Sequence, residues 1–218
     1  MLEFVEEDHL YVLDGIIIPS VSQILHVIFK DKYKDVPENI LRAKAQYGTT
    51  IHEYIERYEN NEELPSLDYI QQASFKQYLK IKEENRIEVL EQEQMIHYKD
   101  KYAGRFDMIA KVDNDIALCD IKTTAELDLE YLSWQLSLYA FAIGKKFDKL
   151  YAIWLPKKEL GKLVEIKRKT EREILKMLED YEEEIEDEEE EEEFINDYPE
   201  EEYDREQYYE RTYGTSQD

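Results

Sequence analysis

Two aspartates and a lysine in the middle of the chain have the spacing of a catalytic group. Asp107 lies in one strand-like segment, and Asp120 and Lys122 lie two positions apart in the next one. Because side chains two apart on a strand share a face, Asp120 and Lys122 are expected to point the same way, with Ile121 turned toward the core. Two carboxylates on neighbouring strands would form an oxygen-rich site of the kind that Mg²⁺ or Mn²⁺ prefers.

This combination predicts the hydrolysis of a phosphodiester. A lysine beside a metal-bound carboxylate can orient or deprotonate a water molecule, and it can stabilise negative charge on a phosphate. Each residue alone has a simpler interpretation, with Asp107 as a carboxylate at a strand end and Lys122 as a salt-bridge partner of Asp120. The sequence has no serine–histidine–acid pattern and no phosphate-cradling glycine loop, which argues against a small-molecule hydrolase.

The elements that must position these residues follow from hydrophobic periodicity and turn residues. The predicted strands are residues 10–13, 16–18, 86–97, 102–112, 116–121, 148–155 and 162–167. The predicted helices are residues 39–59, 67–84, 127–143, a short one within 21–28, and the stretch from 170 onward. Asp14-Gly15 predicts a hairpin turn, Ser20 or Ser22 would cap the short helix, and the polar residues 31–39 would form a linker. This order indicates an α/β sheet flanked by helices.

The three residues lie within a longer pattern that spans roughly residues 10–155. Its parts are Gly104-Arg105-Phe106-Asp107, Asp120-Ile121-Lys122, the pair Gln135 and Tyr139, and an upstream Gly48 followed by His52. In this order and on these elements, the parts resemble the RecB-type branch of the PD-(D/E)XK nucleases, particularly the stand-alone phage exonucleases. The resemblance implies a restriction-endonuclease-like fold, in which helices flank a central mixed sheet, with an acidic C-terminal helix or tail added here.

The resemblance also implies metal ligands. They would be Asp107, Asp120, the carbonyl oxygen of Ile121, His52 and Glu93. His52 would bind the metal directly or through water, and Glu93, with Glu91 as its rival, would be an outer or second-metal ligand. Lys122 would position the attacking water. Taken alone, His52 would be interpreted as a surface histidine or a hydrogen-bonded core histidine.

Gln135, Tyr139 and Arg105 are the DNA-binding residues that the resemblance implies. Gln135 and Tyr139 are four apart on one predicted helix, so they share a face. An alternative is that this pair braces the catalytic lysine, and a simpler one is that they are ordinary helix-surface and core residues.

The resulting hypothesis is a Mg²⁺- or Mn²⁺-dependent DNA nuclease. An exonuclease of phage recombination or DNA processing, which leaves a 5′-phosphate and a 3′-hydroxyl, is favoured over an endonuclease of the same fold. The alternative is a nuclease-fold DNA mimic whose acidic tail blocks a DNA-binding protein of the host. Related phage exonucleases can form rings, so an oligomer is compatible with either hypothesis.

The distribution of charge separates the chain into two predicted parts, a nuclease domain over residues 1–178 and an acidic tail over 179–218, helical or disordered. The tail holds 21 acidic residues against two arginines, a net charge of −19, which leaves −6 for the rest of the total of −25. A body that is only mildly acidic can still present a local basic groove to DNA. The tail itself could be a solvated segment, a gate over the chain's own DNA groove, or a binding site for a basic protein partner.

The remaining composition indicates a cytoplasmic protein, in the host cell if phage-encoded. No apolar run approaches the roughly 20 residues that span a bilayer, so no membrane partner is expected. The first residues lack the basic flank and apolar stretch of a secretory signal. The one cysteine, Cys119, lies in an apolar run and is predicted to be a buried packing residue.

Overall fold

The computed structural model of the chain describes residues 1–6, 10–29 and 38–196. Most of the predicted linker, residues 31–37, and the part of the predicted tail beyond 196 lie outside the described residues. The chain divides into two units, Met1–Lys176 and Met177–Asp218. Each unit is described by itself, and the candidate site lies in the first.

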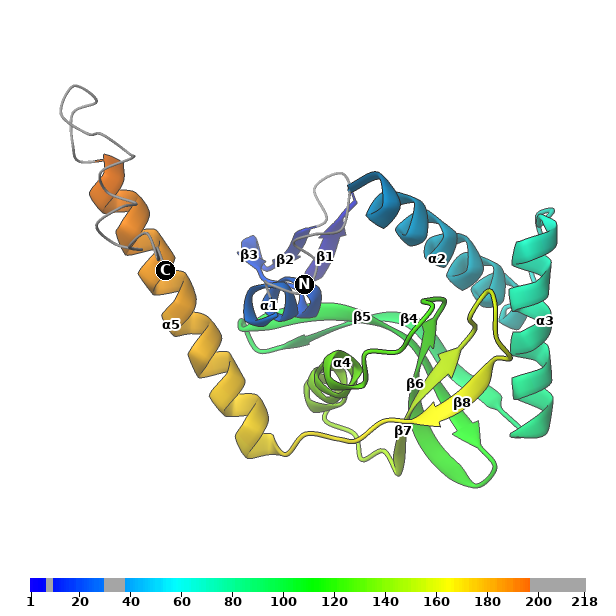
Figure 1. The fold of residues 1–218 in the computed structure, drawn as a ribbon. Helices are drawn as coiled ribbons and strands as arrows, with labels where there is room; N and C mark the ends of the chain where they lie inside the picture. Colours follow the sequence, from blue (N-terminus) through cyan, green and yellow to red (C-terminus); the bar gives the residue numbers. More distant parts are fainter. Residues whose placement is uncertain (7–9, 30–37, 197–218) are drawn as a thin grey trace, which may run out of the picture. The chain divides into compact units, whose positions relative to one another are not determined.

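A five-stranded mixed sheet forms the centre of the first unit (Figure 1). Its strands are, in spatial order, β4 (Glu88–Tyr98), β5 (Tyr102–Val112), β6 (Asp115–Lys122), β7 (Lys149–Trp154) and β8 (Lys162–Glu165). Only β6 and β7 are parallel; every other neighbouring pair is antiparallel. The helix α4 (Leu129–Ile143) connects this parallel pair, because parallel strands need a long crossover connection. The predicted α/β class with a mixed sheet is confirmed.

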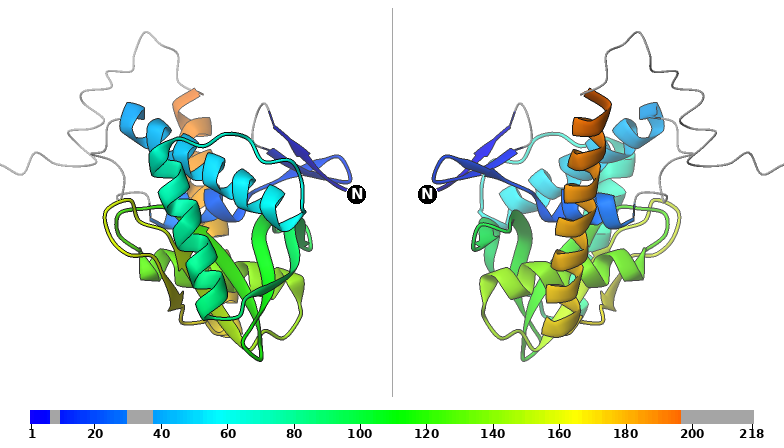
Figure 2. Two further views of the ribbon diagram at one scale, coloured as in Figure 1. Left: turned by 90° about the vertical axis from the view of Figure 1, so that its right-hand side faces the viewer. Right: turned by 90° about the vertical axis from the view of Figure 1, so that its left-hand side faces the viewer.

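Helices cover both faces of this sheet. Figure 2 shows α2 (Glu38–Glu59) and α3 (Tyr69–Glu84) on one face, where their buried residues pack against β5, β6 and β7. This part of the core contains Ile51, Ile55, Tyr78, Ile81, Met108, Ala110, Cys119, Ile121 and Ile153. On the other face, α4 and α1 (Val21–Ile28) contact each other and the sheet. Cys119 is fully buried, as predicted.

The alternation of side chains along β6 follows directly from this packing. Ile121 belongs to the core on the α2 and α3 side, so Asp120 and Lys122 must face the opposite side. The predicted orientation of this triplet is therefore confirmed. A carboxylate and an ammonium group thus lie on the sheet face that α4 covers.

A second, three-stranded antiparallel sheet lies at the N-terminus. It consists of β1 (Leu2–Val5), β2 (Leu10–Leu13) and β3 (Ile16–Ile18), of which the sequence had predicted only the last two as strands. The turn between them has positive φ at both Asp14 and Gly15, as a two-residue hairpin turn that follows the twist of its strands requires. The Ala103 backbone N–H donates a hydrogen bond of 2.9 Å to the Pro19 carbonyl and ties this region to β5.

The caps of the helices resolve one alternative that the sequence left open. Ser20, and not Ser22, is the N-cap of α1, and it forms a reciprocal capping box with Gln23. The C-terminal helix α5 runs over Glu171–Asn196. Among the residues that the structure describes, no helix has both the length and the apolar character needed to cross a membrane.

Candidate active site

Asp107 lies at the point where β5 and β6 stop pairing. The paired register ends with Met108 opposite Cys119, so Asp107 would stand opposite Asp120 one step further along. In place of a backbone carbonyl, the carboxylate of Asp107 accepts a hydrogen bond of 2.6 Å from the Ile121 N–H. The side chain of Asp107 is thereby fixed between the two strands at the start of their separation.

Asp120 and Lys122 form a close ion pair on the adjacent strand. Lys122 Nζ lies 2.6 Å from Asp120 Oδ2, and the Asp120 side chain is 3% exposed against 23% for Lys122. Burial raises the pKa of Asp120 to about 6, a shift that the Lys122 ammonium opposes and the Asp107 charge increases. Burial alone would lower the pKa of Lys122, but the charges of Asp120 and Asp107 outweigh it and raise the pKa.

His52 reaches the same place from α2. The buried neighbours Ile51 and Ile55 fix the apolar face of this helix against the sheet, and His52 is carried to its edge. Its Nε2 donates a hydrogen bond of 2.9 Å to the carbonyl oxygen of Ile121, and its Nδ1 lies 3.4 Å from Asp107 Oδ2. Burial lowers the pKa of His52, but the charge and hydrogen bond of Asp107 outweigh this and raise it to about 9.

Glu93 approaches from the strand on the other side of β5. Gln92 pairs with Met108 and Gln94 with Phe106, so Glu93 stands opposite Asp107. Its φ of 49° is a left-handed conformation, which non-glycine residues adopt at a cost of about 1–3 kcal/mol. Burial and the charge of Asp107 raise the pKa of Glu93 to about 7, while Arg105 opposes the shift.

The structure distinguishes Glu93 from its sequence rival. Glu91 forms an ion pair with Lys145, in which Nζ lies 2.8 Å from Oε1. Glu93 instead lies beside Asp107 and forms an ion pair with Arg105, in which Nε lies 3.0 Å from Oε2. Residues two apart on a strand share a face, so the sequence pattern alone could not show whether Glu91 or Glu93 belongs to the site.

Among the described residues, His52, Glu93 and Asp107 form a group that could hold a metal ion. Each offers one ligand atom, and these atoms lie within 4.8 Å of one another. This differs from the pair of ligands that strand spacing had suggested, because Asp120 is not in this group and instead contacts Lys122. The site fits a divalent cation, since two carboxylates and an imidazole, all groups that bind such ions, converge within 4.8 Å.

Gln135 and Tyr139 lie together on α4, as their spacing predicted, but both are buried. Gln135 Nε2 donates a long hydrogen bond of 3.5 Å to the Tyr139 hydroxyl, and Gln135 Oε1 has no partner. The pKa of Tyr139 is raised by burial and by the nearby charges of Asp120 and Asp107. This arrangement places the pair beside the carboxylates rather than on an open surface, so their DNA-binding role remains a prediction, as does the alternative that they brace Lys122.

Arg105 is about half exposed and lies at the edge of the site. Besides its ion pair with Glu93, its guanidinium carbon lies 6.0 Å from the centre of the Phe4 ring. The ion pair shows that Arg105 neutralises part of the negative charge of the carboxylate cluster. Its contact with DNA stays a prediction.

Gly104 has a steric reason to be glycine. A Cβ atom at this position would lie 2.6 Å from Cε1 of Tyr139, whereas one at Gly48 would meet only Thr123 Oγ1 at 3.5 Å, an ordinary contact. Gly104→Ala is therefore expected to destabilise the fold by about 1–3 kcal/mol, because the buried tyrosine ring must move. Urea unfolding would measure this change.

Gly48→Ala is the matched control for this prediction. Since Gly48 lies within α2 and its Cβ position is not crowded, alanine there should be neutral or stabilise by up to about 1 kcal/mol. An unfolding midpoint for Gly104→Ala equal to that of the unchanged protein would contradict the steric argument.

The sequence and fold of the chain were compared with those of known proteins. The sequence profile of the PD-(D/E)XK nuclease superfamily matches residues 23–213 of this chain, which include all the site residues described above. No curated protein sequence matches significantly. The crystal structure of SSO0001 is similar to this chain with a TM-score of 0.44 and 17% sequence identity, over 74% of this chain and 73% of that one. By the match of its sequence profile, the chain belongs to the PD-(D/E)XK nuclease superfamily.

Proposed function

We propose that this protein is a Mg²⁺- or Mn²⁺-dependent DNA exonuclease of phage recombination or DNA processing. The observation that carries the proposal is the convergence of His52, Glu93 and Asp107 beside the ion pair of Asp120 and Lys122. Membership of the nuclease superfamily supports phosphodiester hydrolysis with a metal ion. The resemblance to stand-alone phage exonucleases supports the finer assignment to exonuclease activity.

The carboxylates and the imidazole of the site would bind the cation. His52, Glu93 and Asp107 would hold the cation. The resemblance implies the Asp120 carboxylate and the Ile121 carbonyl oxygen as further ligands; without a cation these contact Lys122 Nζ and His52 Nε2. When bound, the cation would polarise the scissile phosphate and offset its charge. The hydrogen bond between Asp107 and the Ile121 N–H keeps this carboxylate in place before any substrate arrives.

Lys122 would act on the water and the phosphate. Its ammonium is held 2.6 Å from Asp120, so its position relative to the carboxylates is fixed by an interaction that does not involve DNA. From there it would orient the attacking water and donate to a phosphate oxygen as charge develops. In-line attack would leave a 5′-phosphate and a 3′-hydroxyl. Arg105, at the exposed edge, would meet the DNA backbone.

The proposal is tested with end-labelled linear duplex, linear single strands and covalently closed circular DNA. We expect release of mononucleotides from the linear substrates with Mg²⁺ or Mn²⁺, no release with a chelator, and an intact closed circle in every reaction. The reason is that the carboxylate cluster has too much negative charge to accept a phosphate without a cation. Gel electrophoresis and chromatography of the products would measure this.

Other outcomes would redirect the assignment. Cutting of the closed circle would make the protein an endonuclease of the same fold. If no DNA were cut under any condition and Asp120→Ala left its cellular function unchanged, a DNA mimic acting through the acidic tail would replace the enzyme.

A further inference from the structure

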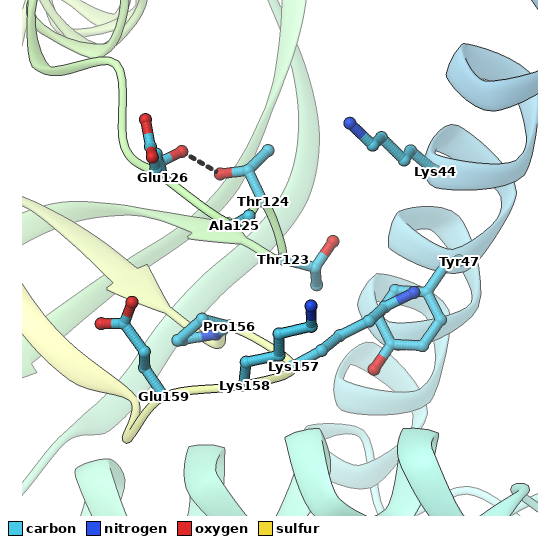
Figure 3. Close-up of a pocket in the computed structure, with 10 residues that line it drawn as sticks. All are labelled: Lys44, Tyr47, Thr123, Thr124, Ala125, Glu126, Pro156, Lys157, Lys158 and Glu159. Carbon is cyan, nitrogen blue, oxygen red and sulfur yellow. Dashed lines mark hydrogen bonds between the residues drawn. The ribbon is translucent and has the colours of Figure 1, made fainter.

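A pocket of about 330 Å³ lies beside the candidate active site (Figure 3). Three parts of the chain line it: α2, the segment that follows β6, and the segment that follows β7. The lining includes Tyr47, Thr123 and Pro156, together with three lysines (Lys44, Lys157 and Lys158) and two glutamates (Glu126 and Glu159). We call this cavity the lysine pocket.

The lysine pocket is continuous with the active site along two elements. Thr123 directly follows Lys122, and the Leu155 N–H donates a hydrogen bond of 2.7 Å to the Lys122 carbonyl, which joins both lining segments to the site. On α2, Lys44 is two turns before His52 on the same face, a distance of roughly 12 Å along the helix. The pocket is therefore within reach of a DNA strand whose phosphate lies at His52.

The pocket combines charged groups with apolar surface. Lys44, Lys157 and Lys158 supply three positive charges, and Glu126 and Glu159 supply two negative ones, so the lining has a small net positive charge in a protein whose net charge is −25. Tyr47 and the buried Pro156 supply flat or apolar surface. This pairing of properties matches a nucleotide, which has an anionic phosphate at one end and a flat base at the other.

The aromatic wall of the pocket is held in place before any ligand binds. The Tyr47 hydroxyl is 2.8 Å from Ser74 Oγ, which fixes the ring. Lys157 Nζ lies over the ring, 3.4 Å from its centre, so a base that stacks on this face would take the place of the ammonium. The opposite wall is fixed by a hydrogen bond of 2.8 Å from Trp154 Nε1 to the Thr124 carbonyl. A binding surface that is ordered in advance costs less entropy when a ligand arrives.

The size of the cavity limits what can enter. A volume of about 330 Å³ is at the lower end of the range of small-ligand pockets, enough for one nucleotide and too small for a base pair. We propose that the lysine pocket binds one unpaired nucleotide of the DNA strand that is cut, next to the scissile phosphate. The proposal rests on the proposed nuclease function and adds that the substrate must be single-stranded or opened at this position.

The test compares binding of two DNA probes in the presence of a chelator, so that cleavage does not enter the result. One probe is a fluorescent single-stranded 12-mer, and the other is a fluorescent duplex closed by an interstrand crosslink at each end, which leaves no base unpaired. For the double variant Lys157→Ala, Lys158→Ala, fluorescence anisotropy should show a Kd for the single strand raised about tenfold, and a change under threefold for the closed duplex. The double variant Lys80→Ala, Lys111→Ala removes two exposed lysines that do not line the pocket, so it is the charge-matched control and should change neither Kd.

A second measurement separates base recognition from general attraction to phosphate. Replacing the bases of the 12-mer by abasic sites should weaken its binding to the unchanged protein about tenfold but have little effect on Tyr47→Ala, which has already lost the aromatic wall. Equal losses for the single strand and the closed duplex, or no loss for either, would overturn the proposal.

The binding assay tests the pocket assignment and the cleavage assay tests the nuclease function, so each can be refuted without the other. Unchanged binding by the lysine variants in a protein that still cuts linear DNA would remove the pocket assignment and leave the nuclease. Selective loss of single-strand binding in a protein that cuts no DNA would leave a pocket for an unpaired nucleotide, but would remove the nuclease and the placement next to a scissile phosphate.

Discussion

An Asp107→Asn variant is expected to lose about 10³-fold in the turnover of linear DNA. Asp107 is the residue on which the site converges, because it contacts His52, accepts the Ile121 N–H and stands opposite Glu93. Asparagine keeps the shape and can still accept the Ile121 hydrogen bond, so the fold should persist. The negative charge that would attract the cation is lost.

Two measurements check this expectation. Initial rates on end-labelled DNA give the loss of turnover, and calorimetric titration with Mn²⁺ should show an affinity at least about tenfold weaker. Asp100→Asn, in the exposed turn after β4, is the matched control and should leave both quantities unchanged. An Asp107→Asn protein that cuts DNA within tenfold of the unchanged rate would show that the cation is held elsewhere.

Replacement of Lys122 by methionine is expected to reduce turnover by about 100-fold or more and also to destabilise the fold. Methionine retains much of the volume of the lysine side chain but leaves Asp120, which is 3% exposed, without its cation. Removing one partner from a buried ion pair typically costs about 3–5 kcal/mol. Urea unfolding and initial rates would measure the two effects separately.

A double variant separates the catalytic loss from the structural one. In Asp120→Asn, Lys122→Met both charges are gone, so most of the lost unfolding free energy should return while turnover stays low. If the double variant regained activity along with stability, Lys122 would be only a structural partner of Asp120.

The combination of a large negative net charge with DNA as substrate has a local explanation. Cations lie in and around the site: Arg105 at one edge, Lys122 inside, and in the adjoining pocket three lysines against two glutamates, Glu126 and Glu159. Attraction of this kind acts over about a Debye length, roughly 8 Å at physiological salt, so it depends on the charges near the groove. The total charge of the chain is a poor guide to such a site.

Much of the fold could be predicted from the sequence because it depends on near neighbours. The strand β5 was predicted with both of its ends, and β6 within one residue at each end, since apolar residues and turn signals mark them. The side-chain orientations of Asp120 and Lys122 followed from the period of two along a strand. The Asp14-Gly15 turn was predicted because few residue pairs tolerate positive φ at both positions.

Only the tertiary structure decided which residues far apart in the sequence come into contact. His52 and Ile121 are 69 positions apart, and no local periodicity brings α2 to the end of β6; only the packing of Ile51 and Ile55 on the sheet does so. The sequence also could not choose Glu93 over Glu91, because both share a strand face and only the register of β4 against β5 sets Glu93 opposite Asp107. Local patterns fix which way a side chain points, whereas long-range packing and register fix what it points at.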